Sequence, residues 1–197
     1  MPEIVLCNAS PHVHGVCDAI MDCLVQIDSQ VQPLVLRRET IAPCQGCRSC
    51  STEPFACPLD TAGDTAKDCL LRLAKAKLLL FCAPIYFYAL PAMAKALIDR
   101  SQRFYTNPLP AQNSTTLVLL TAARNRGEQL FTGSLLTLRY FFAQLGRTIT
   151  QAKTVRGLDL REDFLHNGSL QKELTDWFGQ WLRKAQGQHL RPKREVS

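Results

Sequence analysis

The strongest constraint on the fold comes from two short apolar runs that contain no charged residue. Residues 78–83 read LLLFCA, and residues 115–122 read TTLVLLTA. Runs of this length without polar alternation are typical of strands covered on both faces, as in parallel sheets between two layers of helices. The two runs therefore predict the centre of a parallel sheet.

Weaker strand and helix patterns alternate along the rest of the chain. Residues 3–7, 33–36 and 148–155 read as three further strands. Helical periodicity occurs at residues 15–28, 61–76, 91–104, 128–145 and 167–184. Five strands alternating with five helices predict an α/β domain with a doubly wound parallel sheet and helices on both faces. The flavodoxin-like strand order 2-1-3-4-5 is expected.

The chain length and the distribution of charge along the chain predict one domain and a tail. The chain has 197 residues and a net charge of +6, and much of the excess charge lies near its C-terminal end. We expect a single domain at 1–186 and a basic, disordered tail at 187–197. Because no aromatic residues are interleaved with these charges, nucleic-acid binding is not expected.

Two further features concern membranes and the redox compartment. Residues 78–94 carry no charge, but Pro84 and Pro91 interrupt them, so a membrane span is not expected. The nine cysteines are an odd number, and the apolar start of the chain is too short for a secretory signal. Both features predict reduced thiols and a cytoplasmic protein.

Four of the cysteines fall at one compact spacing, Cys44-x2-Cys47-x2-Cys50-x6-Cys57, in a loop at 43–58. Three thiolates at two-residue gaps, with a fourth nearby, are typical of an iron–sulfur cluster, whereas structural zinc usually takes two well-separated pairs. The spacing predicts a [4Fe-4S] cluster. Zinc, a thiol or disulfide loop, and a motif that no longer binds metal remain the alternatives.

The loops after the first and third strands are expected to form a binding crevice, because the winding of the sheet reverses between these strands. The first loop contains Ser10 and Gly15 and leads into a helix, whose N-terminus attracts phosphate. The third loop, at 83–91, is rich in aromatic residues and suits a flat ring or a subunit interface. The chain contains neither a G-x-G-x-x-G fingerprint nor a Walker motif.

Four motifs over residues 4–105 carry a family resemblance. They are Ser10-Pro11, the cysteine loop, Ala83-Pro84-Ile85-Tyr86, and Lys95 with Asp99-Arg100. In their order and spacing the chain resembles the NADPH-dependent FMN reductase and iron–sulfur flavoprotein group of flavodoxin-like proteins. The resemblance implies bound FMN near the interface of a homodimer or homotetramer. It also implies that Lys95, Asp99 and Arg100 are helix or interface residues.

The resemblance implies two sets of FMN contacts. The phosphate would lie among Ser10, His12, Gly15, Val16 and Cys17. The flavin ring would lie among Pro84, Ile85, Tyr86, Phe87 and Tyr88 on one side and Thr121, Ala122 and Ala123 on the other. The family usually has Arg at the position of His12, Ser or Thr at Cys17 and a small residue at Tyr88, so weaker phosphate contacts are expected.

Three functions follow as hypotheses. The first is an electron-transfer flavoprotein in which FMN and a [4Fe-4S] cluster accept electrons from a donor such as ferredoxin. The second is an NAD(P)H-dependent FMN or quinone reductase without a cluster, in which Arg124 and Arg126 help to bind the dinucleotide. The third is a zinc-binding or thiol redox-sensing module without catalysis. Because parallel strands end at the same edge of a sheet, the cysteine loop is expected to lie on the flavin side, near the flavin of its own or of a neighbouring subunit.

Overall fold

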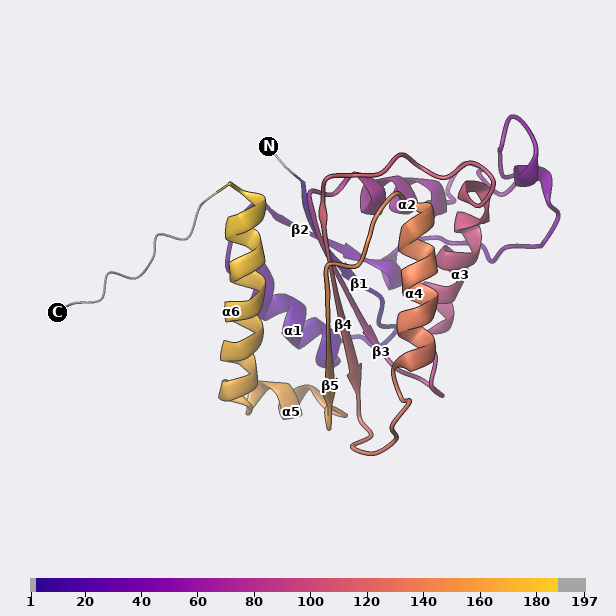
Figure 1. The fold of residues 1–197 in the computed structure, drawn as a ribbon. Coiled ribbons are helices and arrows are strands. Elements are labelled where there is room, and N and C mark those ends of the chain that lie inside the picture. The colour runs from indigo at the N-terminus through magenta and orange to yellow at the C-terminus, as the bar shows by residue number, and fades with distance from the viewer. Residues whose placement is uncertain (1–2, 188–197) are drawn as a thin grey trace.

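The centre of the molecule is a five-stranded parallel sheet with the order β2-β1-β3-β4-β5, as predicted. The computed structural model describes residues 3–187 (Figure 1). The strands are β1 (Ile4–Asn8), β2 (Val31–Val35), β3 (Leu78–Pro84), β4 (Thr115–Ala122) and β5 (Gln151–Arg156). The predicted tail at 187–197 lies, apart from Gly187, outside the described residues.

Helices cover both faces of the sheet (Figure 1). One layer contains α2 (Ala66–Lys75), α3 (Ala92–Arg100) and α4 (Thr132–Gln144), and the other contains α1 (Val16–Val25), α5 (Arg161–Leu165) and α6 (Gly168–Ala185). Short 3-10 turns lie at Leu36–Arg38 (η1), Ser49–Ser51 (η2) and Ser101–Phe104 (η3). The predicted doubly wound α/β class is therefore confirmed.

The two apolar runs form the central strands because both of their faces are buried. In β3, Leu79 and Phe81 pack into the core beneath α2, α3 and α4, while Leu80 and Cys82 pack into the core beneath α1 and α6. This alternation is the two-residue period of a strand. The uncharged stretch at 78–94 is thus a strand, a tight turn and the start of α3. Within the part of the chain that the structure describes, no helix has the length and apolar character needed to cross a membrane.

The largest differences from the sequence prediction concern α2, α4 and α5, and α4 begins at Thr132 rather than at residue 128. Helix α2 begins at Ala66 rather than at residue 61, because Gly63 has a φ of +95° and the Asp64 carboxylate accepts the backbone N–H of Ala66 (3.1 Å). The short helix α5 was not predicted. Its first turn is fixed by Asp163, whose carboxylate accepts the backbone N–H groups of Asp159 and Leu160 (both 2.8 Å).

A buried arginine fixes the amino-terminal edge of the sheet. The Arg147 side chain, 2% exposed, donates to the carbonyl oxygens of Ala74 (3.0 Å), Ala76 (2.6 Å) and Thr115 (2.8 Å) and to the Thr116 hydroxyl (2.9 Å). Burial lowers the pKa of Arg147 to about 10, a value at which the guanidinium is still charged at neutral pH. One side chain thereby joins the end of α2 to the start of β4.

We expect Arg147→Met to lower the free energy of unfolding by about 2–4 kcal/mol, because it leaves three buried carbonyls and a hydroxyl without a donor. Urea denaturation would measure the change. The matched control is Arg139→Met on the exposed face of α4, with an expected change below about 0.5 kcal/mol. Equal effects of the two substitutions would contradict the structural role of Arg147.

Candidate functional site

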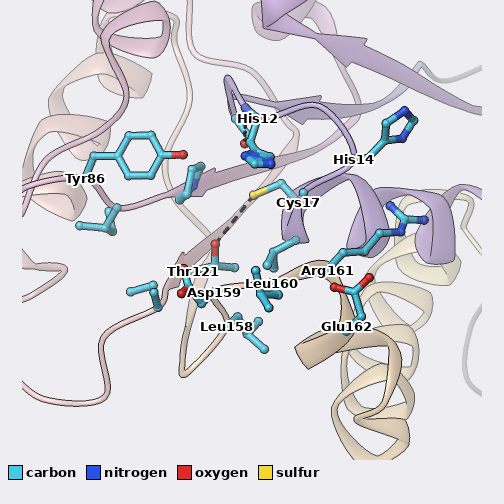
Figure 2. Close-up of a pocket in the computed structure, with 17 residues that line it drawn as sticks. His12, His14, Cys17, Tyr86, Thr121, Leu158, Asp159, Leu160, Arg161 and Glu162 are labelled. Carbon is cyan, nitrogen blue, oxygen red and sulfur yellow. Dashed lines mark hydrogen bonds between the residues drawn. The ribbon is translucent and has the colours of Figure 1, made fainter.

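A cavity of about 540 Å³ opens at the carboxyl ends of β1, β3, β4 and β5 (Figure 2). It lies where the winding reverses, since β1 pairs with β2 on one side and β3 on the other. Cavities of this size and position commonly hold small cofactors. Eleven residues predicted to contact the cofactor line it: Ser10, His12, Gly15, Val16, Cys17, Pro84, Ile85, Tyr86, Thr121, Ala122 and Ala123.

Two predicted contacts, Phe87 and Tyr88, are not part of the cavity wall. They form the tip of a tight turn closed by mutual backbone hydrogen bonds between Tyr86 and Ala89 (both 2.9 Å), and both have left-handed φ angles, +50° and +62°. Phe87 is fully exposed, while the Tyr88 hydroxyl accepts a hydrogen bond from Arg124 (3.3 Å). The turn projects Phe87 away from the protein and leaves Tyr86 beside the cavity.

The loop after β1 is held in shape by a half-buried ion pair that the sequence analysis missed. The Asp18 carboxylate accepts two hydrogen bonds from Arg37 (2.9 and 3.0 Å) and one each from the Asn8 side chain (2.7 Å) and the His14 backbone N–H (2.7 Å). Because Arg37 neutralises Asp18, the carboxylate can stabilise the loop without repelling a bound phosphate. An acidic residue in the first turn of a helix was the available sequence signal.

The loop leaves the N-terminus of α1 accessible to an anion. Its N-cap residue is Gly15, which has no side chain to cap the helix amides. A Cβ at Gly15 would lie 3.2 Å from the His12 ring, so glycine lets the imidazole pack against the loop. Ser10 accepts the backbone N–H of His12 (3.2 Å), which keeps its hydroxyl at the cavity. Such an end binds phosphate readily.

The floor of the cavity combines a thiol and a hydroxyl. The Cys17 Sγ lies 3.8 Å from the Thr121 Oγ1 (Figure 2). A hydrogen bond with Cys17, together with burial, raises the pKa of Cys82 behind it. Burial, and to a smaller extent the nearby Cys17, also raises the pKa of Tyr86. Cys82 and Tyr86 therefore remain neutral at physiological pH and offer hydrogen bonds rather than charge.

One wall of the cavity was not predicted. Leu158, Asp159, Leu160, Arg161 and Glu162 line it from the segment after β5, and His14 lines its rim. Arg161 also forms an ion pair with Asp22 of α1 (3.1 Å), which holds the start of α5 against the first helix. These contacts join residues far apart in the sequence, and no local pattern signals them.

The four cysteines of the loop line a second cavity of about 490 Å³: Cys44, Cys47, Cys50 and Cys57. Asp99 and Gln102, at the end of α3, complete its wall, and the loop projects beyond this end of the helix (Figure 1). The cavity at the carboxyl ends of the strands lies next to the start of α3, because the turn after Tyr86 leads into this helix. Within one chain, the cysteine cavity therefore lies at the other end of α3 from the cavity at the strand ends, and the expectation of a neighbouring subunit's flavin beside the cysteines stays a prediction.

The thiols of this cavity differ in their surroundings. Hydrogen bonds with Ser49 lower the pKa of the exposed Cys47, whereas burial raises the pKa of Cys50. Among residues 3–187, no three histidine, cysteine or acidic side chains are close enough together to hold a single metal ion. The arrangement thus gives no support to zinc. The same observation on residues 3–187 leaves the predicted [4Fe-4S] cluster without support, although the four cysteines line one cavity.

Comparison with known proteins identifies the family. The profile described as NADPH-dependent FMN reductase matches residues 2–152. This chain belongs to that family. An iron–sulfur flavoprotein from Methanosarcina thermophila is 24% identical over 127 residues, which are 62% of this chain and 64% of the relative. The match thus spans less than two thirds of the length of that relative.

Solved structures of the same fold include two reductases. One is an FMN-dependent NADH-azoreductase from Bacillus anthracis in complex with FMN (TM-score 0.63, 15% identity, covering 90% of this chain and 98% of that one). The other is an NADPH-quinone reductase from P. pentosaceus (TM-score 0.58, 13% identity, covering 92% and 97%). At these identities the similarity establishes the flavodoxin-like fold alone. The wall after β5 lies beyond the family match.

In this member of the FMN reductase family, buried ion pairs fasten the cysteine loop to α3. Arg100 donates to Asp64 (2.8 and 3.0 Å), to Asp60 (2.8 Å) and to the carbonyl oxygen of Ala42 (3.0 Å). Arg103 forms a two-point contact with Asp60 (2.6 and 2.7 Å). Both ends of the loop are thereby held at one point, which gives Arg100 a structural role.

We expect the Asp64–Arg100 contact to make the free energy of unfolding depend on pH in the acid range. Burial alone would raise the pKa of Asp64, but Arg100 and the N–H groups of Ala42 and Ala66 hold it below its usual 3.8. The contact therefore stabilises the fold above pH 3.8, and the stabilisation is lost as the pH falls below this value. Asp64→Asn should be about 2–4 kcal/mol less stable at pH 7 and should lose less on acidification.

Urea denaturation at several pH values between about 2 and 7 would measure both effects, because the linked protonation falls in this interval. Asp176→Asn is the matched control, since Asp176 pairs with Lys172 on the exposed surface of α6. Its expected effect is below about 1 kcal/mol. An acid dependence that is the same in the wild type and in Asp64→Asn would contradict the assignment.

Proposed function

We propose that the protein is an FMN-dependent oxidoreductase that accepts electrons from NAD(P)H and passes them to a flavin, a quinone or another acceptor. The observation that carries this proposal is the cavity at the switch point, which combines an uncapped helix N-terminus with an apolar wall in a chain of the FMN reductase family. The helix N-terminus suits a phosphate, and the apolar wall suits a flat ring.

The residues of the cavity divide into two groups. Ser10, Gly15, Val16 and Cys17 would hold the phosphate at the start of α1, with His12 beside it. Tyr86 and its neighbours after β3 would contact one side of the flavin, and the segment at 121–123 would contact the other. When bound, FMN supplies exchange between two-electron and one-electron transfer. The chain supplies orientation, exclusion of water and neutral hydrogen-bonding groups.

Two cations for a dinucleotide donor follow the segment at 121–123 that lines the cavity. Arg124 and Arg126 follow β4, and Arg124 is held by the Tyr88 hydroxyl. Arginine side chains bind phosphate groups through two parallel hydrogen bonds. We therefore place the phosphates of NAD(P)H on this side of the cavity, with Tyr88 positioning Arg124 rather than stacking on the flavin.

A second candidate function adds a [4Fe-4S] cluster, with ferredoxin as a donor. It is favoured by the convergence of Cys44, Cys47, Cys50 and Cys57 on one cavity. This candidate includes a reducing, cytoplasmic environment, in which thiols stay available as cluster ligands. A thiol redox sensor without metal is the remaining alternative, supported by the lowered pKa of the exposed Cys47.

The position of the cysteines has a consequence for electron transfer. They lie at the end of α3 that is farther from the flavin cavity. From Pro91 to Gln102 the helical path extends for roughly 15–20 Å at the usual rise per residue. In a homodimer or homotetramer, exchange between the two cofactors would therefore run between subunits rather than within one chain.

One anaerobic experiment distinguishes the two functions. The protein is loaded with FMN, treated with iron and sulfide, and mixed in separate samples with NADPH and with reduced ferredoxin. We expect NADPH to bleach the flavin absorption at about 450 nm within seconds, at rates ordinary for enzymes. Bleaching by ferredoxin alone, in protein with about four irons per chain, would favour the second candidate. Failure to bind FMN would overturn both.

We expect His12→Arg to bind FMN about tenfold more tightly than the wild type. Arginine provides a permanent charge and a planar fork for the phosphate, and a charge-assisted hydrogen bond is worth about 1.4 kcal/mol or more. Titration of flavin fluorescence would give the dissociation constants. His14→Arg is the control, because the His14 side chain points away from the cavity centre (Figure 2). Equal gains in both variants would indicate a general charge effect instead of a contact with the phosphate.

A further inference from the structure

A groove of about 760 Å³ runs along α1 beside the edge strand β2. The helix contributes five residues spaced by three or four positions, which places them on one face: Asp18, Met21, Asp22, Val25 and Gln26. The strand and the residues after it contribute four more: Pro33, Val35, Arg37 and Arg38. We name this feature the α1 groove. None of the residues expected to contact FMN lines it.

The α1 groove adjoins the cavity at the strand ends. Two residues, His14 and Arg161, line both of them, and their side chains point away from the centre of the cavity (Figure 2). The segments at 84–86 and 121–123, which are proposed to contact the flavin ring, line the cavity but not the groove. The groove therefore continues from the proposed phosphate end of the cavity, beside the N-terminus of α1, and not from its ring end.

The charges of the groove favour an anion near this junction. Its wall carries three arginines and two aspartates, so one positive charge is in excess. Arg37 pairs with Asp18 (2.9 Å), whereas Arg161 makes a single contact from Nη2 with the exposed Asp22 (3.1 Å). The Nη1 of Arg161 has no hydrogen-bond partner within residues 3–187. Because an exposed ion pair contributes little free energy, Arg161 can exchange Asp22 for a phosphate at small cost.

The part of the groove farther from the cavity is apolar. Val25 lies in the last turn of α1, and Pro33 precedes the end of β2 by two residues. Helix α1 has ten residues and therefore extends for about 15 Å from the junction. Cations at one end and an apolar slot beyond them suit a nucleoside monophosphate whose base lies away from the cavity.

We propose that the protein binds FAD, with the FMN half in the cavity at the strand ends and the adenylate half in the α1 groove. This inference rests on the proposed function, in which the N-terminus of α1 binds the flavin phosphate. Arg161 contacts the second phosphate, Arg38 adds positive charge, and the adenine lies against Val25 and Pro33. The adenylate of NAD(P)H fits the groove less well, because its nicotinamide must reach the flavin ring at the other end of the cavity.

Calorimetric titration of the apoprotein with FMN and with FAD tests the proposal. We expect FAD to bind at least about tenfold more tightly than FMN, because one additional charge-assisted contact has about this effect. Pro33→Trp places an indole in the groove and should remove most of the preference for FAD. The matched control is Gln32→Trp, which introduces the same ring at the neighbouring exposed position on the opposite face of the sheet. This variant should keep the preference of the wild type.

Three outcomes would overturn the adenylate site. They are equal affinities of the wild type for the two flavins, a preference for FAD that persists in Pro33→Trp, and a Pro33→Trp effect on NADP⁺ binding to the FMN-loaded protein with no effect on FAD. The last result would assign the groove to the dinucleotide donor. If Pro33→Trp does not fold, Arg161→Gln decides: a reduced preference for FAD supports the proposal, and an unchanged one overturns it.

The titration with FMN separates this inference from the oxidoreductase proposal. If neither flavin binds to the wild type, the proposed function and the adenylate site are both overturned. If FMN binds and FAD binds no more tightly, the adenylate site alone is overturned. The two failures are therefore distinguishable.

Discussion

The parallel pairing of β1 with β3 is the constraint on which the cofactor cavity depends. Asn8 at the end of β1 lies opposite Cys82, and the next residue, Ala9, donates its N–H to the Cys82 carbonyl (2.8 Å). Ile85 donates in the same way to Thr121 (2.8 Å), which continues the ladder beyond β3. These backbone contacts set the level at which three loops leave the sheet. The cavity is therefore a consequence of strand register, and side chains only adapt it to a ligand.

Long loops on this frame are fixed by arginine–aspartate contacts instead of by hydrophobic packing. Arg37 and Asp18 shape the loop that would receive phosphate, and Arg100 with Asp64 fixes the cysteine loop. In both cases the carboxylate also accepts backbone N–H groups of the loop that it stabilises. Each aspartate therefore links an arginine from a distant part of the chain to the backbone of the loop, and this link restrains the conformation of the loop. The planar guanidinium suits this task because it binds both carboxylate oxygens at once.

The sequence was sufficient to predict the sheet, but it was not sufficient to predict the complete wall of the cavity. Uncharged runs predicted β3 and β4 because strands buried on both faces leave no room for polar alternation. The segment after β5 could not be found, since Arg161 and Asp22 lie 139 residues apart and no periodicity connects them. The rule that parallel strands end at one edge placed the start of the cysteine loop correctly. It failed for the cysteines because the loop is long, and because Asp60 and Asp64 attach it to α3.

Helix α3 consequently separates two sites that differ in chemistry. Its first turn follows the aromatic turn beside the proposed flavin cavity, and its last turn carries the arginine that holds the cysteine loop. A rigid helix cannot bring its own ends together, so one chain keeps the two sites apart. Two copies related by a twofold axis perpendicular to α3 would instead oppose the flavin end of one copy and the cysteine end of the other. A second copy would then complete the electron path rather than merely stabilise the first, which makes oligomerisation part of the proposed chemistry.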